Sequence, residues 1–155
     1  MNDSTLVYTA QSKQFFYCRD AVCEFVFQNG AVPLNPFRAF DYFLGDRVNR
    51  DSVRRGNMRL LEAADEVWVF GDTLADGVVI EIAQAARSSK PLRYFTIDNR
   101  ASNIKETSLV NLDVEVEVLV RTGLDRAVLL RHLTNGGADI IVHALGRARE
   151  LSERV

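Results

Sequence analysis

The stretch ADEVWVFGDTLADGVVIEIAQAARSSKPLRYFTI, residues 64–97, carries the pattern that decides the fold. Residues 66–70 (EVWVF) are a continuous apolar and β-favouring run, which is typical of a buried strand. Residues 76–87 then show helical spacing on one apolar side, formed by Val78, Val79, Ile82, Ala83 and Ala86. Residues 91–97 begin with proline, which loses no ladder hydrogen bond at the first position of a strand. The stretch therefore predicts a β-α-β unit with parallel strands.

The same alternation of strands and helices precedes this unit. Residues 6–10 (LVYTA) and 31–34 (AVPL) are short β-favouring runs. Helical spacing separates them over residues 15–28, closed by Asn29-Gly30 as a C-cap. Residues 37–46 predict an aromatic-rich loop or short helix, and residues 47–64 predict a long helix.

The pattern changes after residue 97. Residues 98–108 are polar and predict a loop, whereas residues 114–120 alternate apolar and acidic side chains, which favours a half-exposed edge strand. Two helices are predicted at residues 124–133 and 138–151, separated by Asn135-Gly136-Gly137. The chain is thus predicted to be an α/β protein with a flavodoxin- or Rossmann-like parallel sheet, helices on both faces and additional C-terminal helices.

Length and composition narrow the class of protein. With 155 residues, 47% apolar and 26% charged, the chain fits one soluble domain. A net charge of −2 argues against binding a nucleic acid polymer. Cys18 and Cys23 point apart on a helix, which predicts neither a disulfide nor a metal site. Residues 1–5 lack a signal peptide's apolar run, and no run approaches the ~20 residues that span a membrane. We therefore expect a cytoplasmic protein without membrane contact.

The loop over residues 71–77 (GDTLADG) is the first candidate for a functional site, because parallel sheets bind ligands at the carboxyl ends of their strands. The N-terminus of the following helix offers free N–H groups to an anion, and Gly77 permits close approach of the backbone to a ligand. Glu81 lies one turn into the helix, within reach of the same volume as the Thr73 hydroxyl. A plain helix start fits too, with Asp76 as the N-cap and Glu81 as a surface carboxylate.

Residues 64–97 also resemble a segment of the nucleoside 2-deoxyribosyltransferases, which reads strand, acidic glycine-containing loop, Gly-x-x-x-Glu, alanine-rich helix, Lys-Pro and strand. They look closer still to a set of often phage-borne relatives with the pattern WVFG…DGM..EI..A…KP. The spacing from Gly77 to Glu81, the alanines after Glu81 and Lys90-Pro91 carry the resemblance. It implies a single domain of this type over residues 1–155.

The resemblance also implies a reaction. In that family the glutamate of the motif attacks the anomeric carbon of the sugar and expels the base, and a second base or water then releases the sugar. By position, Glu81 would be the nucleophile, and Asp72 or Asp76 would be the acid/base for the base that leaves. The chemistry suits carboxylates, because the transition state is oxocarbenium-like and the departing nitrogen needs a proton.

Further substrate contacts are predicted around these carboxylates. Tyr8 stands where the family places substrate contacts, and a buried strand tyrosine is an equal alternative. Gln11 and Ser12 occupy the place of the glycine-rich turn that usually follows the first strand of the enzymes. The full set of predicted contacts is Tyr8, Gln11, Ser12, Gly71, Thr73, Gly77 and Arg54. The ligand implied is a small-molecule nucleoside or nucleotide, with no cofactor and no metal.

Two other clusters leave alternatives open. Arg47, Arg50 and Arg54 share one face of the predicted helix, which is either solvated or binds a phosphate. A phosphate contact would favour a nucleotide over a nucleoside. The aromatic residues Phe37, Phe40, Tyr42 and Phe43 either stack on a base or form a core lid or subunit interface.

The predicted function is cleavage or transfer at the N-glycosidic bond of a (deoxy)nucleoside or nucleotide. One alternative is a non-catalytic module that binds or senses nucleotides on the same fold, and another is an oligomeric structural protein. The C-terminal helices have apolar faces made by Val128, Leu129 and Leu133 and by Ile140, Ile141 and Leu145. Together with the family's habit of completing sites from a neighbouring subunit, these faces predict a homodimer or larger oligomer.

Overall fold

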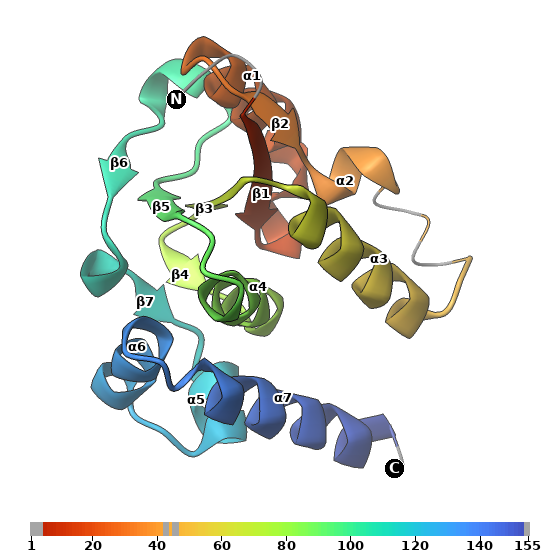
Figure 1. Ribbon diagram of the computed structural model, residues 1–155, viewed down its shortest axis with the longest axis vertical. Helices are drawn as coiled ribbons and strands as arrows, with labels where there is room; N and C mark the ends of the chain where they lie inside the picture. Colours follow the sequence, from red (N-terminus) through yellow and green to blue (C-terminus); the bar gives the residue numbers. More distant parts are fainter. Residues whose placement is uncertain (1–4, 42–43, 45–46, 154–155) are drawn as a thin grey trace.

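The computed structural model of the protein describes residues 5–41, 44 and 47–153. Its main sheet has the strand order β2-β1-β3-β5-β6, in which the first four strands are parallel and β6 is antiparallel to β5 (Figure 1). The strands are β1 (Leu6–Gln11), β2 (Val32–Leu34), β3 (Glu66–Phe70), β5 (Leu92–Phe95) and β6 (Glu106–Thr107). The predicted α/β fold with a mainly parallel sheet is confirmed.

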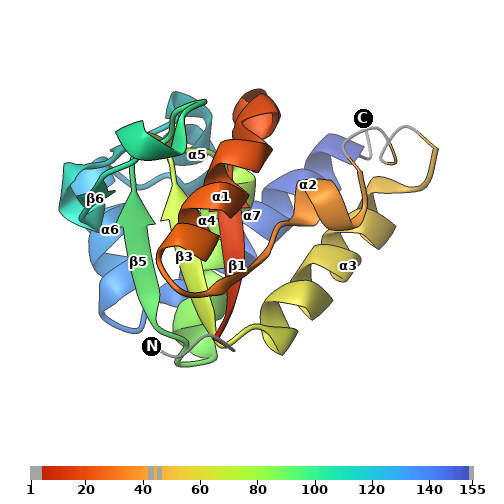
Figure 2. The ribbon, with the colours of Figure 1, turned by 90° about the horizontal axis from the view of Figure 1, so that it is seen from above.

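Helices cover both faces of this sheet (Figure 2). The 3-10 helix η1 (Lys13–Cys18) leads into α1 (Arg19–Gln28), which lies on one face of the sheet. The helices α3 (Arg50–Ala63) and α4 (Asp76–Arg87) lie on the opposite face. Side chains of a strand alternate between faces, and β3 shows this directly. Trp68 and Phe70 join a core cluster with α1, whereas Val67 and Val69 join a second cluster with α4.

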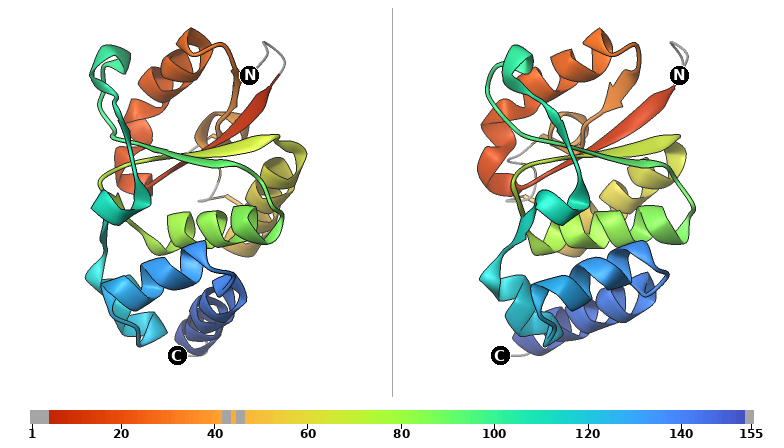
Figure 3. Two further views of the ribbon diagram at one scale, coloured as in Figure 1. Left: turned by 60° about the vertical axis from the view of Figure 1, so that its left-hand side comes forward. Right: turned by 90° about the vertical axis from the view of Figure 1, so that its left-hand side faces the viewer.

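The C-terminal helices form a further layer on the outer side of α4 (Figure 3). They are α5 (Val116–Thr122), α6 (Arg126–Thr134) and α7 (Ala138–Glu153). Their apolar residues Leu129, Leu133, Ile141 and Leu145 are buried in the same cluster as α4. These apolar faces therefore pack against other elements of the same chain, although Ile140 remains 55% exposed. The homodimer stays a prediction.

The predicted edge strand over residues 114–120 is wrong. Only β7 (Asp113–Val114) is extended there, and it pairs with β4 (Thr73–Leu74) in a separate two-stranded parallel sheet. The chain then turns into α5, where Val118 is buried and Val116 and Val120 are each 75% exposed. Alternation over seven residues is too short to exclude a helix, and the pair of Glu117 with Arg121 at i,i+4 supports the helical form.

Two other segments differ in detail from the sequence predictions. The predicted loop at residues 98–108 contains the 3-10 helix η3 (Ala101–Asn103) and strand β6, and η4 (Leu109–Asn111) follows it. The aromatic segment begins with the short helix α2 (Pro36–Ala39), in which Asn35 caps the N-terminus by accepting a hydrogen bond from the Phe37 N–H. The predictions for Tyr42 and Phe43 lie outside the described residues.

No helix in the part of the chain that the structure describes combines the length and the apolar character needed to cross a membrane.

A pair of glycine substitutions tests the packing of the C-terminal helices. A Cβ at Gly137, between α6 and α7, would lie 2.1 Å from His132 Nδ1 and 2.9 Å from His132 Cβ. Gly137→Ala should therefore lower the free energy of unfolding by about 1–3 kcal/mol through overpacking. Gly146→Ala in α7 meets open space and should raise it by up to about 1 kcal/mol, because alanine favours a helix. Urea denaturation checks both, and equal midpoints for the two variants would contradict this packing.

Candidate active site

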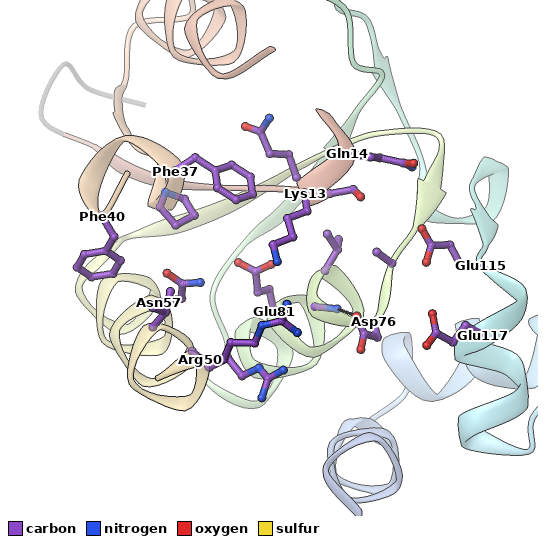
Figure 4. Close-up of a pocket in the computed structure, with 18 of the residues that line it drawn as sticks. Lys13, Gln14, Phe37, Phe40, Arg50, Asn57, Asp76, Glu81, Glu115 and Glu117 are labelled. Carbon is purple, nitrogen blue, oxygen red and sulfur yellow. Dashed lines mark hydrogen bonds between the residues drawn. The ribbon is translucent and has the colours of Figure 1, made fainter. Parts of the chain in front are cut away.

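A cavity of about 670 Å³ opens at the carboxyl end of β1 (Figure 4). Its walls come from the end of β1, from η1 and α2, from α3, from the first turns of α4 and from α5. Its volume lies within the range of pockets that bind small ligands and is sufficient for a nucleotide.

Glu81 lies in the middle of this cavity, on the second turn of α4 (Figure 4). The side chain of Tyr8, from β1, is fully buried behind it and donates a hydrogen bond from its hydroxyl to Glu81 Oε2. Burial raises the pKa of Glu81 to about 7, and the hydrogen bond from Tyr8 opposes that rise. Burial and the Glu81 charge raise the pKa of Tyr8 well above its ordinary value. Tyr8 therefore remains a neutral donor while Glu81 titrates near neutral pH.

A buried polar network fixes the backbone beside this pair. Asn35 Nδ2 donates to Thr9 Oγ1 at 2.9 Å and to Gln11 Oε1 at 2.8 Å. Gln11 Nε2 in turn donates to the Phe15 carbonyl at 2.8 Å. Each of these three side chains is at least 96% buried, so the bonds replace contacts with water that burial removes. The network joins the end of β1 to η1 and α2, and thereby holds two walls of the cavity.

One end of the cavity is acidic. Asp76 begins α4, and its Oδ1 accepts a hydrogen bond from the Gly77 N–H at 2.7 Å. Arg121, from α5, bridges two carboxylates, with Nη1 2.9 Å from Asp76 Oδ2 and Nη2 2.6 Å from Glu117 Oε1. Glu115 lies beside them, and its pKa is raised by burial and then by the charges of Asp76 and Glu117. A phosphate at this helix N-terminus would therefore meet carboxylates.

The opposite side of the cavity is basic and aromatic (Figure 4). Lys13 projects into the cavity from η1, and Arg50 and Arg54 line it from α3. Arg54 Nη1 also lies 2.8 Å from Asp51 Oδ1, which holds the guanidinium in place. Phe37 and Phe40 complete this wall. The Phe40 ring packs on Gly56, where a Cβ would lie only 2.9 Å from two ring atoms.

The structure brings together most, but not all, of the predicted site residues. Gln11, Ser12, Arg54, Asp76, Gly77 and Glu81 line the cavity, with Tyr8 directly behind Glu81. Gly71, Asp72 and Thr73 lie outside its lining, because the loop after β3 leaves the cavity to pair with β7. The Asp72 carbonyl accepts a hydrogen bond from the Asp113 N–H at 2.9 Å, and the Asp72 side chain is exposed.

The alternative interpretation of Asp76 and Glu81 as a plain helix start is wrong in two respects. The N-cap of α4 is Ala75, which makes no side-chain capping bond, and Asp76 is the first helical residue. Glu81 is 9% exposed and is therefore no surface carboxylate.

Several residues of the cavity were missed by the sequence predictions. Lys13 lines the cavity and Asn35 holds its wall, and neither was among the predicted site residues. Glu115, Glu117 and Arg121 reach the cavity only because residues 116–122 are helical, against the predicted edge strand. Within the described residues, no group of three or more His, Cys, Asp or Glu side chains is arranged to hold a metal ion.

Comparison with known proteins places the chain in a family. The profile of a domain of unknown function, DUF7768, matches residues 8–95, which is more than half of the chain. The chain belongs to this family. The DUF7768 segment runs from Tyr8 to the end of β5 and includes Glu81, the buried polar network and the basic wall. Glu115, Glu117 and Arg121 of the acidic end lie beyond it. No curated protein matches the chain.

Proposed function

We propose that this DUF7768 protein cleaves or transfers the N-glycosidic bond of a nucleoside or nucleotide, with Glu81 as the nucleophile. The observation that supports this function most directly is the buried pair of Tyr8 and Glu81 in a cavity of nucleotide size. A carboxylate is seldom buried unless it is paired or functional, and here burial raises its pKa to about 7. The resemblance of residues 64–97 to the nucleoside 2-deoxyribosyltransferases supports the same reaction.

The position of Glu81 suits attack on a sugar. As the bond to the base breaks, positive charge develops on the sugar ring, and an ionised carboxylate in a water-poor site stabilises it. The Glu81 carboxylate then forms a covalent bond with the anomeric carbon. Tyr8 fixes one carboxylate oxygen, which restricts the rotation of the side chain and leaves the other oxygen for the sugar. Water or a second base displaces Glu81 in the second step.

The two ends of the cavity suggest how a nucleotide would lie across Glu81. Lys13, Arg50 and Arg54 supply positive charge for a 5′-phosphate on one side. The carboxylates on the other side repel a phosphate, so the base lies at that acidic end. We therefore place the phosphate at the basic wall instead of at the N-terminus of α4.

A base-release assay tests the function. The protein is incubated with a panel of ribo- and deoxyribonucleosides and their 5′-monophosphates, and free base is measured by chromatography, with and without a second base as acceptor. We expect release from at least one monophosphate. Binding of nucleotides without release would support a sensing module instead, and the absence of both binding and release would support a structural role.

A nucleoside 5′-monophosphate should bind more tightly than its nucleoside. A hydrogen bond to a charged group contributes about 1.5–3 kcal/mol, so the difference in Kd should be about tenfold or more and should shrink as salt rises. Arg50→Ala should remove much of the difference. Arg59→Ala is the matched control, because Arg59 is on the same helix, pairs with Glu62 and does not line this cavity. Calorimetry with the Glu81→Gln variant measures binding without turnover, and equal Kd values for nucleotide and nucleoside would remove the phosphate from the proposal.

A further inference from the structure

The acidic end of the cavity holds three carboxylates whose surroundings differ. Arg121 forms ion pairs with Asp76 and Glu117, one through each terminal nitrogen of its guanidinium. Asp76 also accepts the Gly77 N–H. Glu115 lies next to both of these anions but is not one of the two carboxylates that Arg121 pairs with. Arg121 thus pairs with two of the three carboxylates, and Glu115 is the third.

The backbone places Glu115 at the acidic end of the cavity, directly after the two-stranded sheet of β4 and β7. The pairing of β4 with β7 brings residues 113 and 114 beside the loop that leads into α4. The Glu115 N–H then donates to the Leu74 carbonyl at 3.0 Å, and Glu115 occupies the N-cap position of α5. Its side chain faces the cavity from the side opposite to Arg50 and Asn57, with Glu81 between them (Figure 4).

We propose that Glu115 is the catalytic acid that protonates the departing base, and the base that then activates the incoming nucleophile. This assignment rests on the proposed function of Glu81. It replaces Asp72, which is exposed and outside the cavity, and Asp76, whose two oxygens are held by Arg121 and the Gly77 N–H.

The two steps balance as follows. In the first step, a Glu81 oxygen forms a bond to C1′, the C1′–N bond breaks, its electron pair goes to the base nitrogen, and the base takes the proton of Glu115. In the second step, water attacks C1′ and gives a proton to the Glu115 carboxylate, while the electron pair of the C1′–O bond returns to Glu81. With an incoming base in place of water, the proton comes from its N–H group. Both carboxyl groups are then restored.

The surroundings of Glu115 suit this role. Burial comes first among the causes that raise its pKa, and the charges of Asp76 and Glu117 add to it. A carboxyl group that keeps its proton closer to neutral pH is a better donor to the leaving nitrogen. An amide at position 115 would have no proton to give, so base release should slow when this carboxyl group is removed.

Two substrates with the same sugar phosphate test the assignment. One is an ordinary nucleotide that the parent protein cleaves, and the other carries a pyridinium base, which leaves as a neutral molecule without a proton. Glu115→Gln should lower kcat for the ordinary nucleotide by roughly 10²- to 10⁴-fold, the usual contribution of general acid catalysis. It should leave kcat for the pyridinium nucleotide nearly unchanged, because that base leaves without a proton. Glu115→Asp, which keeps a carboxyl group, should recover part of the loss.

Glu117→Gln is the comparison within the same cluster. It alters the charge next to Glu115 but keeps the Glu115 carboxyl group, so it should change the ratio of the two substrates far less than Glu115→Gln does. An equal loss on both substrates for Glu115→Gln, or no loss on either, overturns the role of Glu115 while leaving that of Glu81 intact. If the parent releases base from neither substrate, the proposed function itself fails, and the role of Glu115 fails with it.

Discussion

Glu81→Gln is expected to lower kcat for base release by roughly 10³-fold or more, which is the size of effect seen when a nucleophile is removed from an enzyme. The amide of glutamine carries no negative charge, so it neither stabilises the developing positive charge of the sugar nor forms the covalent bond. Its side-chain oxygen still accepts the hydrogen bond from Tyr8, so the cavity should keep its shape. The Kd for a nucleotide should therefore change little, because the lost interaction belongs to the transition state.

Single-turnover kinetics and calorimetry separate these two quantities. Asp72→Asn is the matched control, since it also converts a carboxylate to an amide but at an exposed position outside the cavity, and it should keep the parental kcat. Turnover by Glu81→Gln at the parental rate would show that the mechanism is wrong. A large rise in Kd with kcat unchanged would instead make Glu81 a binding residue.

The central β-α-β unit was the part of the fold most open to prediction. The bounds of β3 and α4 in the structure, Glu66–Phe70 and Asp76–Arg87, are those that the sequence pattern predicts. Both elements are set by local chemistry: a run of buried β-favouring residues in one, and a strong helical period in the other. Lys90, read as part of a motif, has a structural role as well, since its Nζ donates to the carbonyls of Glu62 at 3.1 Å and Ala64 at 2.6 Å at the end of α3.

Individual residues of the site could be predicted from the sequence, but the contacts between them could not. Tyr8 and Glu81 were both candidates, but their hydrogen bond joins residues 73 positions apart, and no local pattern reports such a contact. The acidic end was missed for a related reason. Alternation at residues 114–120 fits a strand and a short helix alike, and the choice is made by the pairing of β4 with β7 and by burial of Val118. Only that choice brings Glu115 and Arg121 to the cavity.

Burial of Glu81 should also make the protein less stable as the pH rises. In the unfolded chain Glu81 loses its proton near pH 4.5, whereas in the folded chain it does so near pH 7. Between these values the folded state holds more protons than the unfolded state, so its free energy of unfolding falls as pH increases and levels off above pH 7. Below pH 4.5 Glu81 is protonated in both states, so its burial no longer lowers the free energy of unfolding. The pKa shift of Glu81 corresponds to a loss of at most about 3 kcal/mol in the free energy of unfolding.

Glu81→Gln removes this cost, because the amide does not ionise. The variant should be more stable than the parent by up to about 3 kcal/mol at pH 8 and should differ little from it at pH 4, which urea denaturation at the two pH values would measure. Glu24→Gln, at an exposed position of α1, should show no such pH-dependent gain. Parallel stability curves for parent and Glu81→Gln would mean that Glu81 titrates in the folded protein as it does in the unfolded chain. A gain that appears only at high pH, together with the loss of base release, would show that the protein retains a charged carboxylate at the expense of its own stability because the reaction requires it.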